Sequence, residues 1–310
     1  MIRSSIDIGT NSVLLLVAEF QNGRLRVLEE EQSVPRLGKG VDSARTLHPD
    51  SMQRVLDVLI RYKELLNQKY PDISDDTIVT ATSAVRDSAN REEFLDKIKE
   101  ETGWEVRLLS GDEEAETTFR GAVSVLKPCE SDFVRVVLDI GGGSTEIAAG
   151  SDTELKEAVS VDMGSVRFSE KFLKSDPPQP AEMDAARKEI QNLLEGVRMN
   201  GIMSRPTGRI EAVGVAGTVT SVAAIELGLD EYDADKINGF VLTKNRLGYI
   251  IDKFSKADSN QIEKEYPVFL AGRGDVILAG LLILDEFLGW CGVTEITVST
   301  GGIRHGVLLG

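Results

Sequence analysis

The chain has 310 residues, of which 41% are hydrophobic and 28% charged, and this composition is typical of a folded protein and excludes wholesale disorder. Its formal net charge of −16 excludes a broad surface for nucleic acid or for an anionic membrane, because either partner would require a basic face. Residues 1–7 lack the pattern of a signal peptide. The most apolar stretch, residues 276–288, is interrupted by Asp285 and Glu286 and is too short to span a bilayer. We therefore expect a cytoplasmic protein, with enough residues for two domains.

Predicted strands and helices alternate in the first part of the chain. Apolar segments predict strands, and the dipeptide Asn22-Gly23 predicts a hairpin turn between two of them. Helical spacing of apolar residues predicts the helices. In chain order, the expected strands are residues 4–8, 13–19, 24–30, 77–82 and 105–109, and the expected helices are residues 49–69, 91–101 and 112–126.

The second part of the chain starts after residues 127–132, which have the composition of a linker. Residues 175–180 are rich in proline and predict a rigid loop, which leads into a helix. That helix buries Met183, Ile190, Leu193, Leu194 and Val197. The other expected elements are strands over residues 134–140, 210–215 and 294–299 and helices over residues 218–227, 276–288 and 303–309.

One short pattern occurs twice. Residues 6–12 read IDIGTNS, and residues 138–144 read LDIGGGS. Each block follows an apolar strand and precedes a second strand, which predicts a hairpin in both places. A chance match of two glycine turns is the alternative, and the shared Asp, Ile, Gly and Ser in the same strand context disfavour it. The repeat predicts two domains of related topology that face each other.

The residue types in both blocks suit the binding of phosphate and a metal ion. Asp7 and Asp139 each end a buried strand, where a carboxylate is costly unless it is coordinated, and Mg²⁺ prefers such oxygen ligands. Glycine lets the backbone approach a phosphate, whose oxygens accept hydrogen bonds from the N–H groups and hydroxyls that follow. The predicted phosphate-binding residues are Gly9, Thr10, Asn11, Ser12, Gly141, Gly142, Gly143 and Ser144.

With their flanking residues, these blocks resemble the two phosphate loops of the exopolyphosphatase / guanosine pentaphosphate phosphatase (Ppx/GppA) family, part of the actin-like ATPase superfamily. Further segments resemble the family in order: ATSAVR at residues 81–86, LSGDEEA at 109–115, DMGSVR at 162–167, GVAGT at 214–218, AGRGDVI at 271–277 and STGGIRHG at 299–306. The resemblance runs nearly end to end.

The resemblance implies a fold of two α/β domains with ribonuclease-H-like topology. Each domain would be a mixed sheet flanked by helices, with the active cleft between the domains. The expected first domain is residues 1–122 plus 300–310, and the expected second domain is residues 123–299. A homodimer is also implied. The chain is similar to the short, two-domain form of the family, because it lacks the length and the histidines of an additional C-terminal His/Asp-rich domain.

Site roles follow from the same resemblance. Glu114 would be the general base that activates water, and Glu113 is the alternative because helix register decides which carboxylate faces the cleft. Without the resemblance, Glu114 would be interpreted as an acid in the first turn of a helix. Glu146 would join Asp7 and Asp139 in holding Mg²⁺ or its waters, or would be an exposed strand residue. The arginines expected to contact phosphate are Arg86, Arg167, Arg273 and Arg304.

Two of these interpretations have explicit alternatives in the sequence. Arg86 is equally compatible with a surface salt bridge to Asp87 or Glu92. The turn of residues 214–218 occupies the position of the superfamily's nucleoside-binding turn. Glycine at such a junction more often packs a helix close against a strand, so no nucleotide is predicted from it.

The expected reaction is hydrolysis of terminal phosphoanhydride bonds of inorganic polyphosphate, with short chains preferred because the acidic chain repels a long polyanion. Alternatives are hydrolysis of guanosine pentaphosphate, a kinase of the same superfold, and a sensor that binds polyphosphate or an alarmone without turnover. The Glu113-Glu114 pair and residues 81–86 disfavour the kinase, by resemblance.

Overall fold

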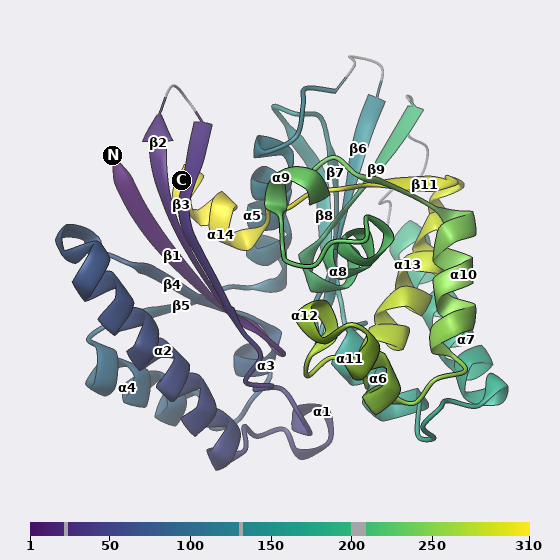
Figure 1. The fold of residues 1–310 in the computed structure, drawn as a ribbon, viewed down its shortest axis with the longest axis horizontal. Coiled ribbons are helices and arrows are strands. Elements are labelled where there is room, and N and C mark those ends of the chain that lie inside the picture. The colour runs from purple at the N-terminus through teal and green to yellow at the C-terminus, as the bar shows by residue number, and fades with distance from the viewer. Residues whose placement is uncertain (22–23, 130–132, 200–208) are drawn as a thin grey trace.

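The structure, a computed structural model, describes residues 1–21, 24–129, 133–199 and 209–310 (Figure 1). The predicted turn at Asn22-Gly23 and part of the predicted linker, residues 130–132, lie outside the described residues. Two sheets form the framework. The first has the strand order β3-β2-β1-β4-β5, and its strands are β1 (Ile2–Ile8), β2 (Val13–Gln21), β3 (Arg24–Ser33), β4 (Ile78–Ala81) and β5 (Val106–Leu108).

The second sheet repeats this order and adds one edge strand. Its order is β10-β11-β9-β6-β7-β8, so β8-β7-β6-β9-β11 corresponds to β3-β2-β1-β4-β5. In both sheets the first strand pairs antiparallel with the next one and parallel with a later one. The strands are β6 (Phe133–Ile140), β7 (Thr145–Gly150), β8 (Leu155–Val161), β9 (Arg209–Val215), β10 (Val241–Thr243) and β11 (Glu295–Val298).

Helices flank both sheets, as Figure 1 shows. Those of the first half are α1 (Val41–Ala44), α2 (Pro49–Lys69), the 3₁₀ helix η1 (Pro71–Ile73), α3 (Ser83–Arg86), α4 (Arg91–Thr102) and α5 (Gly111–Ser124). Those of the second half are α6 (Ser165–Phe172), α7 (Pro180–Met199), α8 (Ala216–Glu226), α9 (Ala234–Ile237), α10 (Lys244–Phe254), α11 (Ser259–Glu265), α12 (Pro267–Leu270), α13 (Ile277–Cys291) and α14 (Ile303–Leu309). The predicted fold class, two α/β units with mixed sheets flanked by helices, is confirmed.

Strand alternation decides which side chains of the first sheet face which layer. Ile6 and Ile8 of β1 are fully buried in the core that α2 and α4 complete. Leu16 and Ala18 of β2 lie on the opposite face, in a small cluster with Leu308 of α14. Asp7 lies between Ile6 and Ile8, so it points toward the face that α14 covers.

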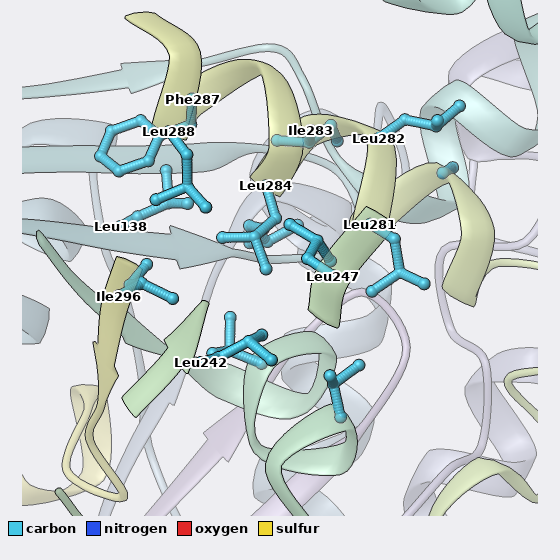
Figure 2. Packing of buried hydrophobic residues seen from close by; sticks show 14 of the residues in the cluster. Leu138, Leu242, Leu247, Leu281, Leu282, Ile283, Leu284, Phe287, Leu288 and Ile296 are labelled. Atoms are coloured by element: carbon cyan, nitrogen blue, oxygen red, sulfur yellow. The ribbon is translucent and has the colours of Figure 1, made fainter. Parts of the chain in front are cut away.

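The second sheet divides its side chains in the same way. Leu138 of β6 belongs to the large core formed with α13, and Figure 2 shows it beside Phe287 and Leu288. Val137 instead packs with Phe119 of α5 on the other face. Asp139 follows the same alternation and therefore points toward α5.

Helices α5 and α14 lie between the two sheets (Figure 1). Helix α5 contacts β6, β7 and β8, whereas α14 contacts β1 and β2, and the two helices contact each other. The face of each sheet that carries its strand-ending Asp is thus turned toward the middle of the molecule. The division into residues 1–122 plus 300–310 and 123–299 stays a prediction. Among the described residues, no helix is both long enough and apolar enough to cross a membrane.

Candidate active site between two glycine loops

Both β1 and β6 end in a tight turn that is closed by one backbone hydrogen bond. In loop 1, the N–H of Gly9 donates to the carbonyl of Ser12 at 2.9 Å. In loop 2, the N–H of Gly141 donates to the carbonyl of Ser144 at 3.0 Å. The repeated sequence pattern therefore folds into two equivalent loops, one at the end of each central strand.

The two loops touch each other. A Cβ atom on Gly142 of loop 2 would lie only 2.8 Å from the Cβ of Thr10 in loop 1 and 3.2 Å from Cγ2 of Val166. The Thr10 hydroxyl is itself held 2.9 Å from the hydroxyl of Ser83. Glycine is required at residue 142 because no side chain fits between the loops in this arrangement.

A row of polar side chains crosses the second sheet beneath loop 2. The strand register places Asp139 of β6 opposite Glu146 of β7, and Glu146 opposite Ser160 of β8. Opposed residues of antiparallel strands point to the same face, so the two carboxylates are neighbours. Ser160 Oγ donates to Glu146 Oε1 at 2.6 Å, and Thr118 Oγ1 of α5 donates to Asp139 Oδ2 at 3.3 Å. These hydroxyls orient two buried acids, which repel each other when both are charged.

Glu114 reaches the same region from the first turn of α5. This turn is fixed by a capping box in which Ser110 and Glu113 bond each other's backbone N–H groups. The box turns Glu113 toward the surface, where it pairs with Arg107 at 2.8 Å. Glu114 is only 5% exposed, and Arg86 Nη1 donates to its Oε2 at 2.8 Å. Of the two adjacent acids, Glu114 is the one that faces the interior.

The charges of these acids interact across the site. Burial raises the pKa of Asp7 to about 7, and the charge of Asp139 adds to this increase. Burial raises the pKa of Asp139 to about 6, and burial with the charge of Asp139 raises the pKa of Glu146 to about 8. Burial and Glu146 hold the pKa of Glu114 well above its usual value, although Arg86 opposes this. By contrast, the backbone N–H of Ser110 lowers the pKa of Glu113 to about 2.

A cleft of about 560 Å³ opens along both loops. Asp7, Glu114 and Asp139 line it together, so the two strand-ending aspartates share one crevice. Asp7 Oδ1 has no hydrogen-bond partner among the described residues, and neither has Glu146 Oε2 behind the wall. Two buried carboxylate oxygens of the site are therefore available for a bound group.

Two arginines also line this cleft. Arg273 is 8% exposed, its Nη2 donates to Ser12 Oγ of loop 1 at 2.9 Å, and burial lowers its pKa to about 10. Its Nε has no hydrogen-bond partner within the described part of the chain. Arg304 donates through Nη1 to the carbonyl of Leu15 and lies 3.3 Å from Glu30. Both cations are held where an anion in the cleft could meet them.

The structure does not bring every predicted site residue to the cleft wall. Of the predicted phosphate ligands, Gly9, Thr10, Asn11, Ser12, Gly141, Gly142, Arg273 and Arg304 line it. The predicted phosphate ligands Gly143, Ser144, Arg86 and Arg167 do not line it, and neither does the predicted metal ligand Glu146. Arg86 bonds Glu114 and also lies 3.8 Å from Asp87, so it takes part in the salt bridge given above as the alternative.

Comparisons with known proteins identify the family of this chain. The model of the Ppx/GppA phosphatase family matches residues 16–310. The chain belongs to the Ppx/GppA phosphatase family. It is 33% identical to exopolyphosphatase 2 of Mycobacterium tuberculosis, over 99% of this chain and 97% of that protein. It is 31% identical to a bifunctional 3-dehydroquinate synthase/phosphatase of Fusobacterium nucleatum, over 99% of this chain but only 46% of that protein.

Solved structures of the family share the fold. A Ppx/GppA family member from Aquifex aeolicus has a TM-score of 0.81 and 31% identity, covering 100% of this chain and 96% of that one. An exopolyphosphatase from Cytophaga hutchinsonii has a TM-score of 0.89 and 26% identity, covering 99% of this chain and 96% of that one.

Some contacts within the candidate site of this Ppx/GppA chain were not predicted from its sequence. Thr118 and Ser160 orient Asp139 and Glu146, but each is distant in sequence from the acid that it contacts. Ala216, at the start of α8, lines the cleft with a φ of 64°, a left-handed conformation that is uncommon for a residue with a side chain. Strained backbone of this kind is often found at ligand sites.

The buried acids predict how stability depends on pH. Above pH 5 the unfolded chain releases the protons of all three acids, whereas the folded chain keeps those of Asp139, Asp7 and Glu146 up to their raised pKa values of about 6, 7 and 8. The free energy of unfolding without added metal should therefore fall as pH rises, by about 1.4 kcal/mol per pH unit for each excess proton. Urea unfolding in a chelator at pH 5, 6.5 and 8 measures this slope, and Glu146→Gln should make it shallower. An identical slope for that variant would contradict the assignment.

Proposed function

We propose that this chain is an exopolyphosphatase that hydrolyses terminal phosphoanhydride bonds of inorganic polyphosphate and prefers short chains. The observation that carries the proposal is that Asp7, Glu114 and Asp139 line one cleft together with loops 1 and 2 and Arg273. Relatives named exopolyphosphatase support the substrate. A second candidate is guanosine pentaphosphate, because other relatives are named guanosine-5'-triphosphate,3'-diphosphate pyrophosphatase.

Phosphate binding would come from both loops. The terminal phosphate would accept hydrogen bonds from loop N–H groups and the Thr10 hydroxyl, with Arg273 compensating its charge. Because the loops touch at Gly142, one small anion can contact both. The net charge of −16 and the acidic site favour a short chain, which needs only these local contacts.

Glu114 would act as the general base. A water molecule beside it attacks the terminal phosphorus in line with the bridging oxygen, and Glu114 accepts the proton of that water. The new bond joins the water oxygen to phosphorus, the anhydride P–O bond breaks, and the shortened chain leaves with its charged terminal oxygen. Arg86 favours the deprotonated carboxylate that this step requires, since it lowers the pKa of Glu114.

The acids of the site fit a divalent cation whose other ligands are water and substrate oxygens. No group of three or more His, Cys, Asp or Glu among the described residues is close enough to hold a metal alone. Mg²⁺ keeps several waters and usually binds through one or two carboxylates and substrate phosphates. Asp7 and Asp139, with Glu146 behind them, would hold it, and the free Asp7 Oδ1 suits this role. When bound, Mg²⁺ would neutralise phosphate charge.

The direct test is phosphate release from tripolyphosphate, from long polyphosphate and from guanosine pentaphosphate, each with and without Mg²⁺. We expect release from tripolyphosphate that a chelator abolishes, with slower turnover of long chains. Preferred release from guanosine pentaphosphate would transfer the assignment to the second candidate. ATP-dependent phosphorylation of a small acceptor would instead indicate a kinase, and binding without release would indicate a sensor.

The proposal also covers the cellular location and the oligomeric state of the protein. We place it in the cytoplasm and expect a homodimer, as the family resemblance implied. Sedimentation of the purified protein measures the oligomeric state.

A further inference from the structure

Arg167 of α6 contacts both loop 2 in its own half of the molecule and two acids of the other half. Its Nε donates to the carbonyl of Gly143 in loop 2 at 2.7 Å. Its Nη1 donates to Asp42 of α1 at 2.6 Å, and its Nη2 donates to Asp87 at 2.9 Å. The Arg167 side chain is 13% exposed, so its guanidinium is largely removed from solvent. Arg167 thus ties loop 2 to two acids of the first half.

Asp87 connects this tie to the proposed base. It directly follows Arg86, and its Oδ1 lies 3.8 Å from Arg86 Nε, whereas its Oδ2 accepts the bond from Arg167. Arg86 Nη1 in turn donates to Glu114 Oε2 at 2.8 Å and to the carbonyl of Leu109 at 3.0 Å. Four side chains of alternating charge, Arg167, Asp87, Arg86 and Glu114, therefore connect loop 2 to the proposed base.

Glu114 depends on such support because its surroundings disfavour its charged form. It is buried beside Glu146 and Asp139, and Arg86 is the cation that holds its carboxylate. Arg86 keeps its orientation through Leu109 and through the attraction of Asp87. If loop 2 moved away from loop 1, Arg167 would move with it, and Asp87 would be left beside Arg86 without its second partner.

We propose that Asp87 is a positioning residue that couples the contact between the two loops to the orientation of Glu114. The coupling runs from Arg167 through Asp87 and Arg86, and it rests on the proposed role of Glu114 as base. Arg167 thereby orients the catalytic machinery and does not contact the substrate phosphate.

Asp42 supplies a matched control. It accepts a bond from the same guanidinium as Asp87, but among the described contacts it is joined to Arg167 and not to Arg86. Asp87→Asn should lower kcat for phosphate release from tripolyphosphate about tenfold and change KM less than about threefold, since a slightly misoriented base slows the chemical step. Asp42→Asn should leave kcat within about threefold.

A double-mutant cycle separates coupling from simple loss of packing. Arg167→Gln should lower kcat about as much as Asp87→Asn, and the double variant should lose little more, because both changes break one chain of contacts. Asp87→Glu keeps the carboxylate and should retain more activity than Asp87→Asn. Thermal unfolding checks that each variant is folded, and Arg167→Gln with Asp87→Glu still test the proposal if Asp87→Asn does not fold.

The outcomes distinguish the two proposals. Equal loss of kcat in Asp42→Asn and Asp87→Asn, or additive effects in the cycle, would overturn the positioning role alone. An increase in KM without loss of kcat in Arg167→Gln would show phosphate binding by Arg167 and would also overturn it. A wild-type protein that releases no phosphate from any of the three substrates would defeat the proposed function itself.

Discussion

Replacing Glu114 by Gln is expected to lower kcat for phosphate release from tripolyphosphate by roughly 10²–10⁴-fold, the usual contribution of a general base. Gln has nearly the same shape and can still interact with its neighbours, but it cannot accept the proton of the attacking water. KM should change only a few fold, because Glu114 is expected to act on water and not to bind the chain. Steady-state kinetics with saturating Mg²⁺ measure both constants.

Glu113→Gln is the matched control for this prediction. Glu113 is adjacent in sequence, but it closes the capping box with Ser110 and pairs with Arg107 at the surface. Gln can still close a capping box, so the helix start should survive and kcat should remain within about twofold. If Glu113→Gln were the slower enzyme, the base would have been assigned to the wrong carboxylate.

Replacing Gly142 by Ala is expected to reduce kcat roughly 100-fold, the cost of displacing catalytic groups by about 1 Å. Its added methyl would lie 2.8 Å from Thr10 Cβ, so loop 2 must move away from loop 1. Kinetics with tripolyphosphate measure the loss, and circular dichroism shows whether the fold is kept.

Gly196→Ala provides the comparison for Gly142→Ala. Gly196 lies within α7, and a Cβ atom there would meet nothing within 4 Å. Alanine at such a helical position should stabilise the protein by up to about 1 kcal/mol and leave kcat unchanged. Full activity of Gly142→Ala would show that the close contact between the loops is dispensable for catalysis.

The sequence predicted the parts of the fold that depend on local patterns. The helix over residues 49–69 matches α2, because its apolar spacing and Pro49 at the first turn define it. The repeated block predicted twin loops, because the same residue types follow an apolar strand in both places, and both turns are closed by the same backbone hydrogen bond. The helix expected at residues 218–227 starts two positions earlier, at Ala216, whose left-handed φ of 64° the sequence did not indicate.

The sequence predicted those site residues whose surroundings follow from their position at the end of a strand. Asp7 and Asp139 were expected together because each ends a central strand, and both line the cleft. The choice between Glu113 and Glu114 depends on which side of α5 faces the cleft, and this is set by the helix start at Ser110. Arg167 was expected in the cleft, but its partners Asp42 and Asp87 are distant in sequence, and no local pattern indicates such pairs.

The position of α14 at the end of the sequence affects how the chain folds during synthesis. Residues 303–309 cover β1 and β2, yet the ribosome adds them only after every strand of the second sheet. While the chain is still being synthesised, Leu16 and Ala18 lack their partner Leu308. Until α14 has been synthesised, one apolar face of the first sheet stays exposed to solvent. Exposed apolar surface of this kind binds chaperones and promotes aggregation. The half that starts synthesis first is therefore the half that finishes folding last.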